Sequence, residues 1–251
     1  MGFEPHELNQ HLETLYRYAI GVTHDPHLAA DAVQDTMTRA LERREQYRND
    51  APLGHWLIRI AHNLMIDHAR RADREVVVDE IETDWQNDAY TVDAEAVVLR
   101  AATRDELRDA LVHLPYIYRS AVVLHDVEGL RVSDVAAIHG VSLPAAKQRL
   151  RRGRMALVSA LASGPQRRIA TKGVPMRCWD ARQHVSEYLN GDLDTPTAAM
   201  VEAHLASCPT CPPLYAALVG VNDALGRLNA RDPDSVIDPD TEQRIRNALA
   251  G

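Results

Sequence analysis

The segment from Leu130 to Leu157, LRVSDVAAIHGVSLPAAKQRLRRGRMAL, decides the fold expected for this chain. Ser133 can cap a short helix, and Gly140 can supply the turn that follows it, because glycine tolerates a positive φ. Ser142 can cap a second helix, and Pro144 is tolerated in the first turn of that helix. Two short helices joined by a glycine-containing turn form a helix-turn-helix.

The second helix of this motif has an apolar stripe on one face and basic side chains over the rest of its surface. Ala146, Leu150 and Leu157 fall on one face at helical spacing. In a helix-turn-helix the second helix enters the major groove, where basic and amide side chains meet phosphates and base edges. A solvated basic face on an ordinary helix pair is the alternative interpretation. The side chains predicted to contact DNA are Lys147, Gln148, Arg149, Arg151, Arg152 and Arg154.

Composition bounds the class of protein. The 251 residues are 45% hydrophobic and include one Phe, which favours small helical units packed with Ala, Leu and Val in an all-α protein. No apolar run approaches the roughly 18 residues of a membrane span, and the N-terminus lacks a basic-then-apolar signal segment. We therefore expect a cytoplasmic protein without a membrane partner.

The net charge of −8 is distributed unevenly along the chain. Residues 73–105 contain ten acidic and three basic side chains, whereas residues 106–164 contain eight basic and five acidic ones. We expect the acidic segment to be a solvated, extended linker. A protein with so little net positive charge in its DNA-binding segment binds DNA poorly through phosphates alone. We therefore expect a larger partner to contribute to DNA binding.

The first 72 residues have the periodicity of three amphipathic helices, at residues 4–23, 27–47 and 53–72. A three-helix bundle with solvated charges is the simplest interpretation. The outward side of the second helix includes Asp31, Gln34 and Asp35. The residues on or near the polar side of the third helix are Arg59, His62, Asn63, Asp67, Arg70 and Arg71.

Two separated motifs, in the right order, resemble bacterial sigma factors of the extracytoplasmic-function group. ADAVQD at residues 30–35, followed by the third-helix pattern from Trp56 to Arg71, resembles their second conserved region. Leu114-Pro115, the Asp126-x-Glu128-Gly129 run and the helix-turn-helix resemble their fourth region. The resemblance covers the chain to about residue 160.

The resemblance implies a non-enzymatic role in transcription initiation. In this family, Asp31, Gln34 and Asp35 would dock on the β′ clamp helices of core RNA polymerase. The β subunit of polymerase would be a further contact partner. The helix-turn-helix would contact the distal promoter element, and the acidic linker would thread the template and RNA channels of polymerase. A purely structural role in the core is the alternative for Trp56. The residues implied to melt and read the promoter element nearest the start site are Trp56, Arg59, Asn63, Asp67, Arg70 and Arg71.

All three cysteines lie near the C-terminus and form a metal-binding pattern with one histidine. His204, Cys208 and Cys211 have the spacing His-x3-Cys-x2-Cys, in which the first two residues share a helical face. Zinc favours four N or S ligands in a closed tetrahedral structural site, and Cys178 completes such a set. Idle thiols beside a surface histidine are the alternative, and His184 competes as the fourth ligand. Four internal ligands argue against a catalytic zinc.

The same region also resembles the zinc-binding anti-sigma domain, which is normally a separate protein. The pattern runs from Cys178 through Tyr188-Leu189-x-Gly191-x-Leu193 to Cys211. It implies an intramolecular contact that blocks the polymerase-binding surfaces, and tethering strengthens even a weak contact. Thiolate oxidation with zinc release would make this a redox switch. A domain that only stabilises the complex or binds another protein is the simpler alternative.

We therefore expect a sigma factor with a fused zinc-binding regulatory domain. A conventional helix-turn-helix regulator that ignores core polymerase is the main alternative, and a zinc hydrolase is a further one. The expected boundaries are a region 2-like domain at 1–73, an acidic linker at 74–104, a region 4-like domain at 105–163, a flexible linker at 164–175, the zinc-binding domain at 176–230 and a tail at 231–251.

Overall fold

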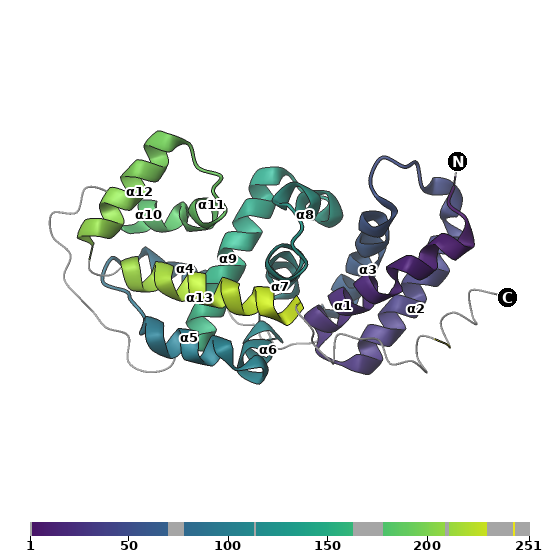
Figure 1. Cartoon of the computed structure of the whole chain (residues 1–251), viewed down its shortest axis with the longest axis horizontal. Coiled ribbons are helices and arrows are strands. Elements are labelled where there is room, and N and C mark those ends of the chain that lie inside the picture. Colours follow the sequence, from purple (N-terminus) through teal and green to yellow (C-terminus); the bar gives the residue numbers. More distant parts are fainter. Residues whose placement is uncertain are drawn as a thin grey trace. The chain divides into compact units, whose positions relative to one another are not determined.

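A computed structural model of the chain describes residues 2–69, 78–112, 114–162, 178–208, 211–229 and 243. Every regular element in these residues is a helix, which confirms the all-α prediction (Figure 1). The described residues fall into two compact units. The first unit lies within residues 1–74, 123–146 and 228–251, and the second within 75–122 and 147–227.

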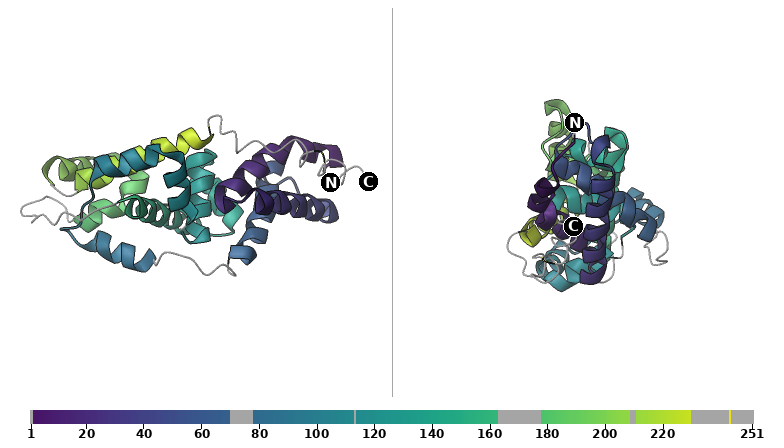
Figure 2. Two further views of the ribbon diagram at one scale, coloured as in Figure 1. Left: turned by 90° about the horizontal axis from the view of Figure 1, so that it is seen from below. Right: turned by 90° about the vertical axis from the view of Figure 1, so that its right-hand side faces the viewer.

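The first unit begins with a bundle of three adjacent helices, α1 (Leu12–Thr23), α2 (Pro26–Glu42) and α3 (Leu53–Ala69) (Figures 1 and 2). The 3-10 helices η1 (Pro5–His11) and η2 (Arg44–Gln46) split off from the two longer helices expected from periodicity. The side chain of Asp25 starts α2, because it accepts hydrogen bonds from the backbone N–H groups of His27 and Leu28.

The same unit contains the π-helical segment η3 (Val123–Val127) and α8 (Val132–His139), the first helix of the helix-turn-helix. Gly140 ends α8 with φ 63°, as its role in the turn requires. The prediction that Ser133 caps α8 is wrong, since Arg131 occupies the cap position in extended conformation. Arg131 instead pairs its guanidinium with Asp134 at 3.2 Å.

The second unit contains the segment predicted to be an extended linker, and that prediction is wrong for its described part. Residues 78–112 form α4 (Val78–Gln86), α5 (Ala94–Ala102) and α6 (Arg104–Val112). Trp85 is fully buried, and its indole N–H donates to Ser159 Oγ at 3.0 Å. Burial of such a large side chain stabilises a helix that periodicity alone does not indicate.

The remaining helices of the second unit are α7 (Tyr116–Val122), the greater part of α9 (Leu143–Leu161), α10 (Cys178–Gln183), α11 (Val185–Leu189), α12 (Thr195–Ser207) and α13 (Cys211–Asn229). Gly153 lets α9 approach α7 closely. A Cβ atom at this position would lie 2.7 Å from Val122 Cγ2 and 2.9 Å from the carbonyl oxygen of Tyr118. The expected apolar stripe of α9 is buried at Ala146, Leu150 and Leu157.

Candidate metal centre and nucleic-acid interface

Three helix ends bring the Cys and His side chains together. Cys178 opens α10, His204 lies in the last turn of α12, Cys208 follows that helix and Cys211 opens α13. All four residues are buried, and their ligand atoms lie within 4.8 Å of one another. The structure therefore groups the four residues that the spacing singled out.

This donor set fits zinc. Cys178 Sγ lies 3.6 Å from Cys208 Sγ, close to the ~3.8 Å edge of a tetrahedron whose Zn–S bonds are about 2.3 Å. Three thiols and one imidazole are a common structural zinc set. The ring of His184, the competing ligand, lies elsewhere, with its Nδ1 3.5 Å from Glu187 Oε2.

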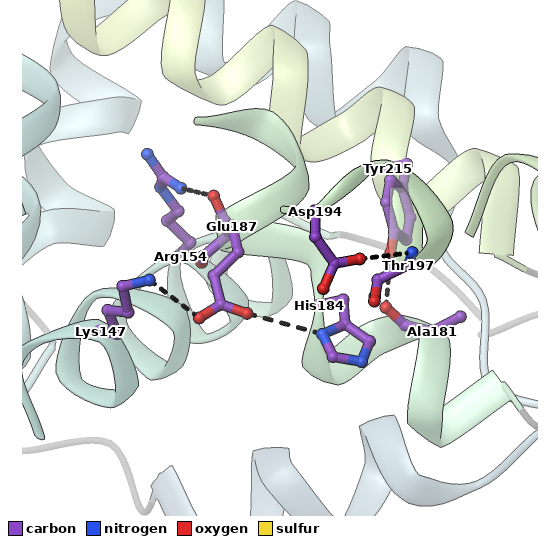
Figure 3. A network of polar contacts seen from close by, with 9 residues as sticks. Lys147, Arg154, Ala181, His184, Glu187, Asp194, Thr197 and Tyr215 are labelled. Carbon is purple, nitrogen blue, oxygen red and sulfur yellow. Dashed lines mark hydrogen bonds and ion pairs between the residues drawn. The ribbon is translucent and has the colours of Figure 1, made fainter. Parts of the chain in front are cut away.

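A buried arginine contacts the cluster of Cys and His side chains. Arg182 of α10 donates from Nε to Cys211 Sγ at 3.3 Å. Burial raises the pKa of the Cys211 thiol, and the charge of Arg182 lowers it in part. Tyr215 of α13 donates its hydroxyl to the carbonyl oxygen of Ala181 at 2.6 Å and so ties α13 to α10 (Figure 3).

The helix predicted to read DNA is engaged by the segment that carries the cluster (Figure 3). Lys147 Nζ lies 3.2 Å from Glu187 Oε1 on α11. Arg154 is 1% exposed and donates to Asn190 Oδ1 at 3.1 Å and to the carbonyl oxygen of Ser186 at 3.4 Å. Two of the basic side chains expected on a DNA surface thus already have protein partners.

A carboxylate of the acidic segment engages two more of them. Glu82 of α4 places Oε1 2.9 Å from Arg151 Nη2 and Oε2 2.6 Å from Arg152 Nη2. These side chains are 11 to 25% exposed, so solvent screens the pairs less than at an open surface. Arg152 also donates to the Tyr118 hydroxyl at 3.2 Å. A carboxylate held between two guanidinium groups occupies them as a phosphate would.

Other predicted site residues lie where partners could reach them. Gln148 is exposed and Arg149 is half-buried on α9, while Arg59 and Asn63 are exposed on α3. Asp31, Gln34 and Asp35 are all exposed on α2.

Trp56 is only partly buried, with its ring centroid 5.4 Å from that of Tyr47 and 5.8 Å from that of Phe3. It therefore packs in an aromatic cluster and still presents some surface. Arg70, Arg71, the side chain of Asp67, the 164–175 linker and all of the tail except residue 243 lie outside the described residues.

Sequence reasoning missed Arg182, Glu82 and Glu187. For Arg182 a signal existed, because it follows Cys178 by four residues and so shares its helical face. Glu82 is one of ten acidic side chains in its segment, and nothing in the sequence distinguishes it.

Within the described residues, every helix is too short or too polar to span a membrane.

Three family matches cover separate parts of the chain. Residues 8–75 match Sigma-70 region 2, and residues 104–157 match Sigma-70, region 4. Residues 178–211, which include the four clustered side chains, match a family described as "Putative zinc-finger".

Two curated relatives agree with the first two matches. ECF RNA polymerase sigma factor SigE of Mycolicibacterium smegmatis is 33% identical over 156 residues, which are 62% of this chain and 60% of SigE. ECF RNA polymerase sigma factor SigM of Mycobacterium tuberculosis is 32% identical over 152 residues, 61% of this chain and 74% of SigM.

Among solved structures, similarity is found to the sigma factor RpoE in complex with the anti-sigma factor NepR from Bartonella quintana. It is 25% identical, covers 62% of this chain and 94% of its own, and has a TM-score of 0.45.

Proposed function

Because this chain belongs to the extracytoplasmic-function sigma factor family, we propose that it binds core RNA polymerase and directs initiation at promoters, under the control of its own zinc-binding domain. The domain holds α9, the helix that reads the distal promoter element. In this proposal zinc is structural, its ligands are Cys178, His204, Cys208 and Cys211, and the protein is not an enzyme.

The observation that carries the regulatory part is the engagement of the basic side chains of α9. Lys147 and Arg154 contact α11 and the residue that follows it, and Arg151 and Arg152 share Glu82. Affinity for DNA depends on how many phosphates such side chains neutralise. While these contacts persist, the helix cannot make its full set of phosphate contacts, so the closed chain is autoinhibited.

Tethering makes this inhibition effective even though each contact is modest. Two parts joined in one chain by a short connection meet at roughly millimolar effective concentration. Partly exposed ion pairs contribute about 0 to 1 kcal/mol each. Promoter DNA presented by polymerase can therefore displace the domain, which suits a regulator better than an irreversible block.

The remaining predicted contacts divide between the two partners. Asp31, Gln34 and Asp35 on the exposed side of α2 dock on polymerase. The nearer promoter element is melted and read from α3 and the residues that follow it, where extruded bases need stacking surfaces and hydrogen bonds to their edges. The residues assigned to this task are Trp56, Arg59, Asn63, Asp67, Arg70 and Arg71.

In vitro transcription tests the sigma assignment. Core polymerase is offered a library of promoter fragments with and without the full, zinc-loaded chain, and duplex binding by the chain alone is measured in parallel. We expect initiation only when both proteins are present. Sequence-specific binding to duplex DNA without polymerase, together with no initiation on any fragment, would show a conventional regulator instead.

Hydrogen exchange tests the regulatory part. In the polymerase complex, promoter DNA should raise amide exchange in α11 and α4, because the DNA displaces Glu187 and Glu82 from α9. A scrambled fragment of equal length is the control. Unchanged exchange in both helices, in a complex that transcribes from the promoter, would contradict competition between the domain and DNA.

A further inference from the structure

Arg182 is one of the largest fully buried side chains of the described residues, with 0% exposure. Its guanidinium connects two features that are far apart in the sequence. Nε donates to Cys211 Sγ at 3.3 Å, Nη1 to the carbonyl oxygens of Trp85 and Asn87 at 2.7 and 2.9 Å, and Nη2 to that of Tyr90 at 2.9 Å.

The three carbonyl groups belong to one turn, residues 85–90, which begins in the last two residues of α4 and leads toward α5. The N–H of Asn87 donates to the carbonyl of Asp84, and that of Tyr90 to the carbonyl of Asn87. Three carbonyls converge on a single guanidinium, which a planar fork of donors can satisfy and a lysine ammonium can satisfy less well. Arg182 therefore fixes the shape of this turn.

The same turn holds α9. The Trp85 indole lies 3.0 Å and the Tyr90 hydroxyl 3.2 Å from Ser159 Oγ, and both aromatic rings are buried. A chain of direct contacts thus runs from Cys211 through Arg182 and the 85–90 turn to Ser159.

We propose that Arg182 is a positioning residue that couples the metal site to α9 through the 85–90 turn. Partners of a metal ligand orient that ligand, and the sulfur of a zinc-bound cysteine accepts such hydrogen bonds. Metal at the cluster holds Cys211 in place, Cys211 and the turn hold Arg182, and the turn holds α9. Coupling of binding equilibria is reciprocal, so loosening the turn weakens zinc binding. This inference rests on the proposed zinc ligands but not on any transcriptional activity.

Hydrogen exchange on the zinc-loaded full chain tests the forward direction. Arg182→Gln should raise exchange at the amides of Asn87 and Tyr90, while the amides of α12 stay protected because the zinc domain is still folded. Arg182→Lys should give an intermediate result. Arg227→Gln, at an exposed position of α13, is the matched control and should change neither segment. Wild-type protection of the turn in Arg182→Gln would overturn the proposal.

Zinc affinity tests the reverse direction with a variant remote from the ligands. Ser159→Ala removes the anchor of the turn, and by reciprocity it should weaken zinc binding several-fold in a chelator competition. Arg182→Gln should weaken it by about 10-fold to 100-fold, as outer-shell substitutions commonly do. Ser133→Ala, at an exposed position of α8, is the control.

Unchanged zinc affinity in Ser159→Ala, with faster exchange in its 85–90 turn, would overturn the coupling even if Arg182→Gln failed to fold. Neither assay contains polymerase or DNA, so failure here is distinguishable from failure of the sigma assignment.

Discussion

Helices α2 and α9 both carry side chains assigned to a partner, but the two helices use those side chains differently within the folded chain. Asp31, Gln34 and Asp35 of α2 are all exposed. On α9, Arg154 is 1% exposed and Lys147 is paired with Glu187. Helix α2 thus presents these side chains to solvent, whereas α9 is held by other parts of its own unit.

This difference suggests that the two partners are controlled separately. A chain with an accessible α2 can dock on polymerase before α9 is released, and promoter DNA then competes with the zinc domain for α9. Under the proposed function, control would then act on promoter engagement rather than on assembly with polymerase. Variants that affect one of the two helices and leave the other unchanged test this difference.

Loss of the metal should have the largest effect, and it should reach the zinc-binding domain and α9 but leave α2 unchanged. Cys208→Ser removes one of four ligands, and binding of a structural zinc contributes roughly 10 kcal/mol or more to the folding of its domain. We expect loss of stoichiometric zinc, measured by metal analysis, and faster amide exchange in α9. Affinity for core polymerase should stay at the wild-type value.

His184→Ala is the control for this prediction and should retain zinc. Loss of zinc in His184→Ala and not in Cys208→Ser would show that the ligand set is wrong.

Charge reversal on α2 should have the next largest effect, and it should leave α9 untouched. Like charges brought together at an interface cost several kcal/mol. Asp35→Arg should therefore weaken binding to core polymerase by at least tenfold, measured by fluorescence anisotropy. Glu202→Arg, an equal reversal at an exposed position of α12, should have little effect. Equal weakening by both variants would remove the special role of α2.

A change at Gly153 should disturb the packing of α9 on α7. The added Cβ of Gly153→Ala would meet Val122 and the carbonyl of Tyr118, and overpacking of this kind costs about 1 to 3 kcal/mol. Chemical denaturation should show this loss. Gly226→Ala in α13, where a Cβ has no neighbour within 4 Å, should instead stabilise by up to about 1 kcal/mol. Equal stability changes in the two variants would contradict the close approach.

The smallest effect is expected from Glu187→Gln. Lys147 and Glu187 are 31% and 30% exposed, and such pairs contribute about 0 to 1 kcal/mol. The variant should unfold within 1 kcal/mol of the wild type in denaturant titrations. A greater loss of stability would mean that this pair holds α9 more firmly than its exposure indicates.

Local features of the sequence predicted much of this structure, and long-range contacts account for the rest. Gly140 acts through its own backbone neighbourhood, so the turn after α8 follows from the residues alone. His204 and Cys208 share a face because a helix repeats every 3.6 residues. The helix α4, by contrast, depends on burial of Trp85 beside Ser159, 74 residues further along the chain.

The partners of α9 could not be read from the sequence for the same reason. Glu82 and Glu187 resemble any other exposed acidic residue until the fold brings them to Arg151 and Lys147. The spacing from Cys178 could place Arg182 near the cluster, but only tertiary structure shows that carbonyl groups of a distant turn surround its guanidinium. Helical periodicity indicates which face of each helix is apolar, but it does not indicate which helices pack against each other.

Promoter-dependent transcription by a double variant tests the central claim most directly. Glu82→Gln combined with Glu187→Gln removes both carboxylates from α9 while keeping the zinc ligands and the size of the side chains. With purified core polymerase and zinc present, we predict several-fold more transcript than from the wild type or from the matched control, Glu106→Gln with Glu202→Gln. Equal or lower transcription, at equal affinity for core polymerase, would contradict autoinhibition through α9.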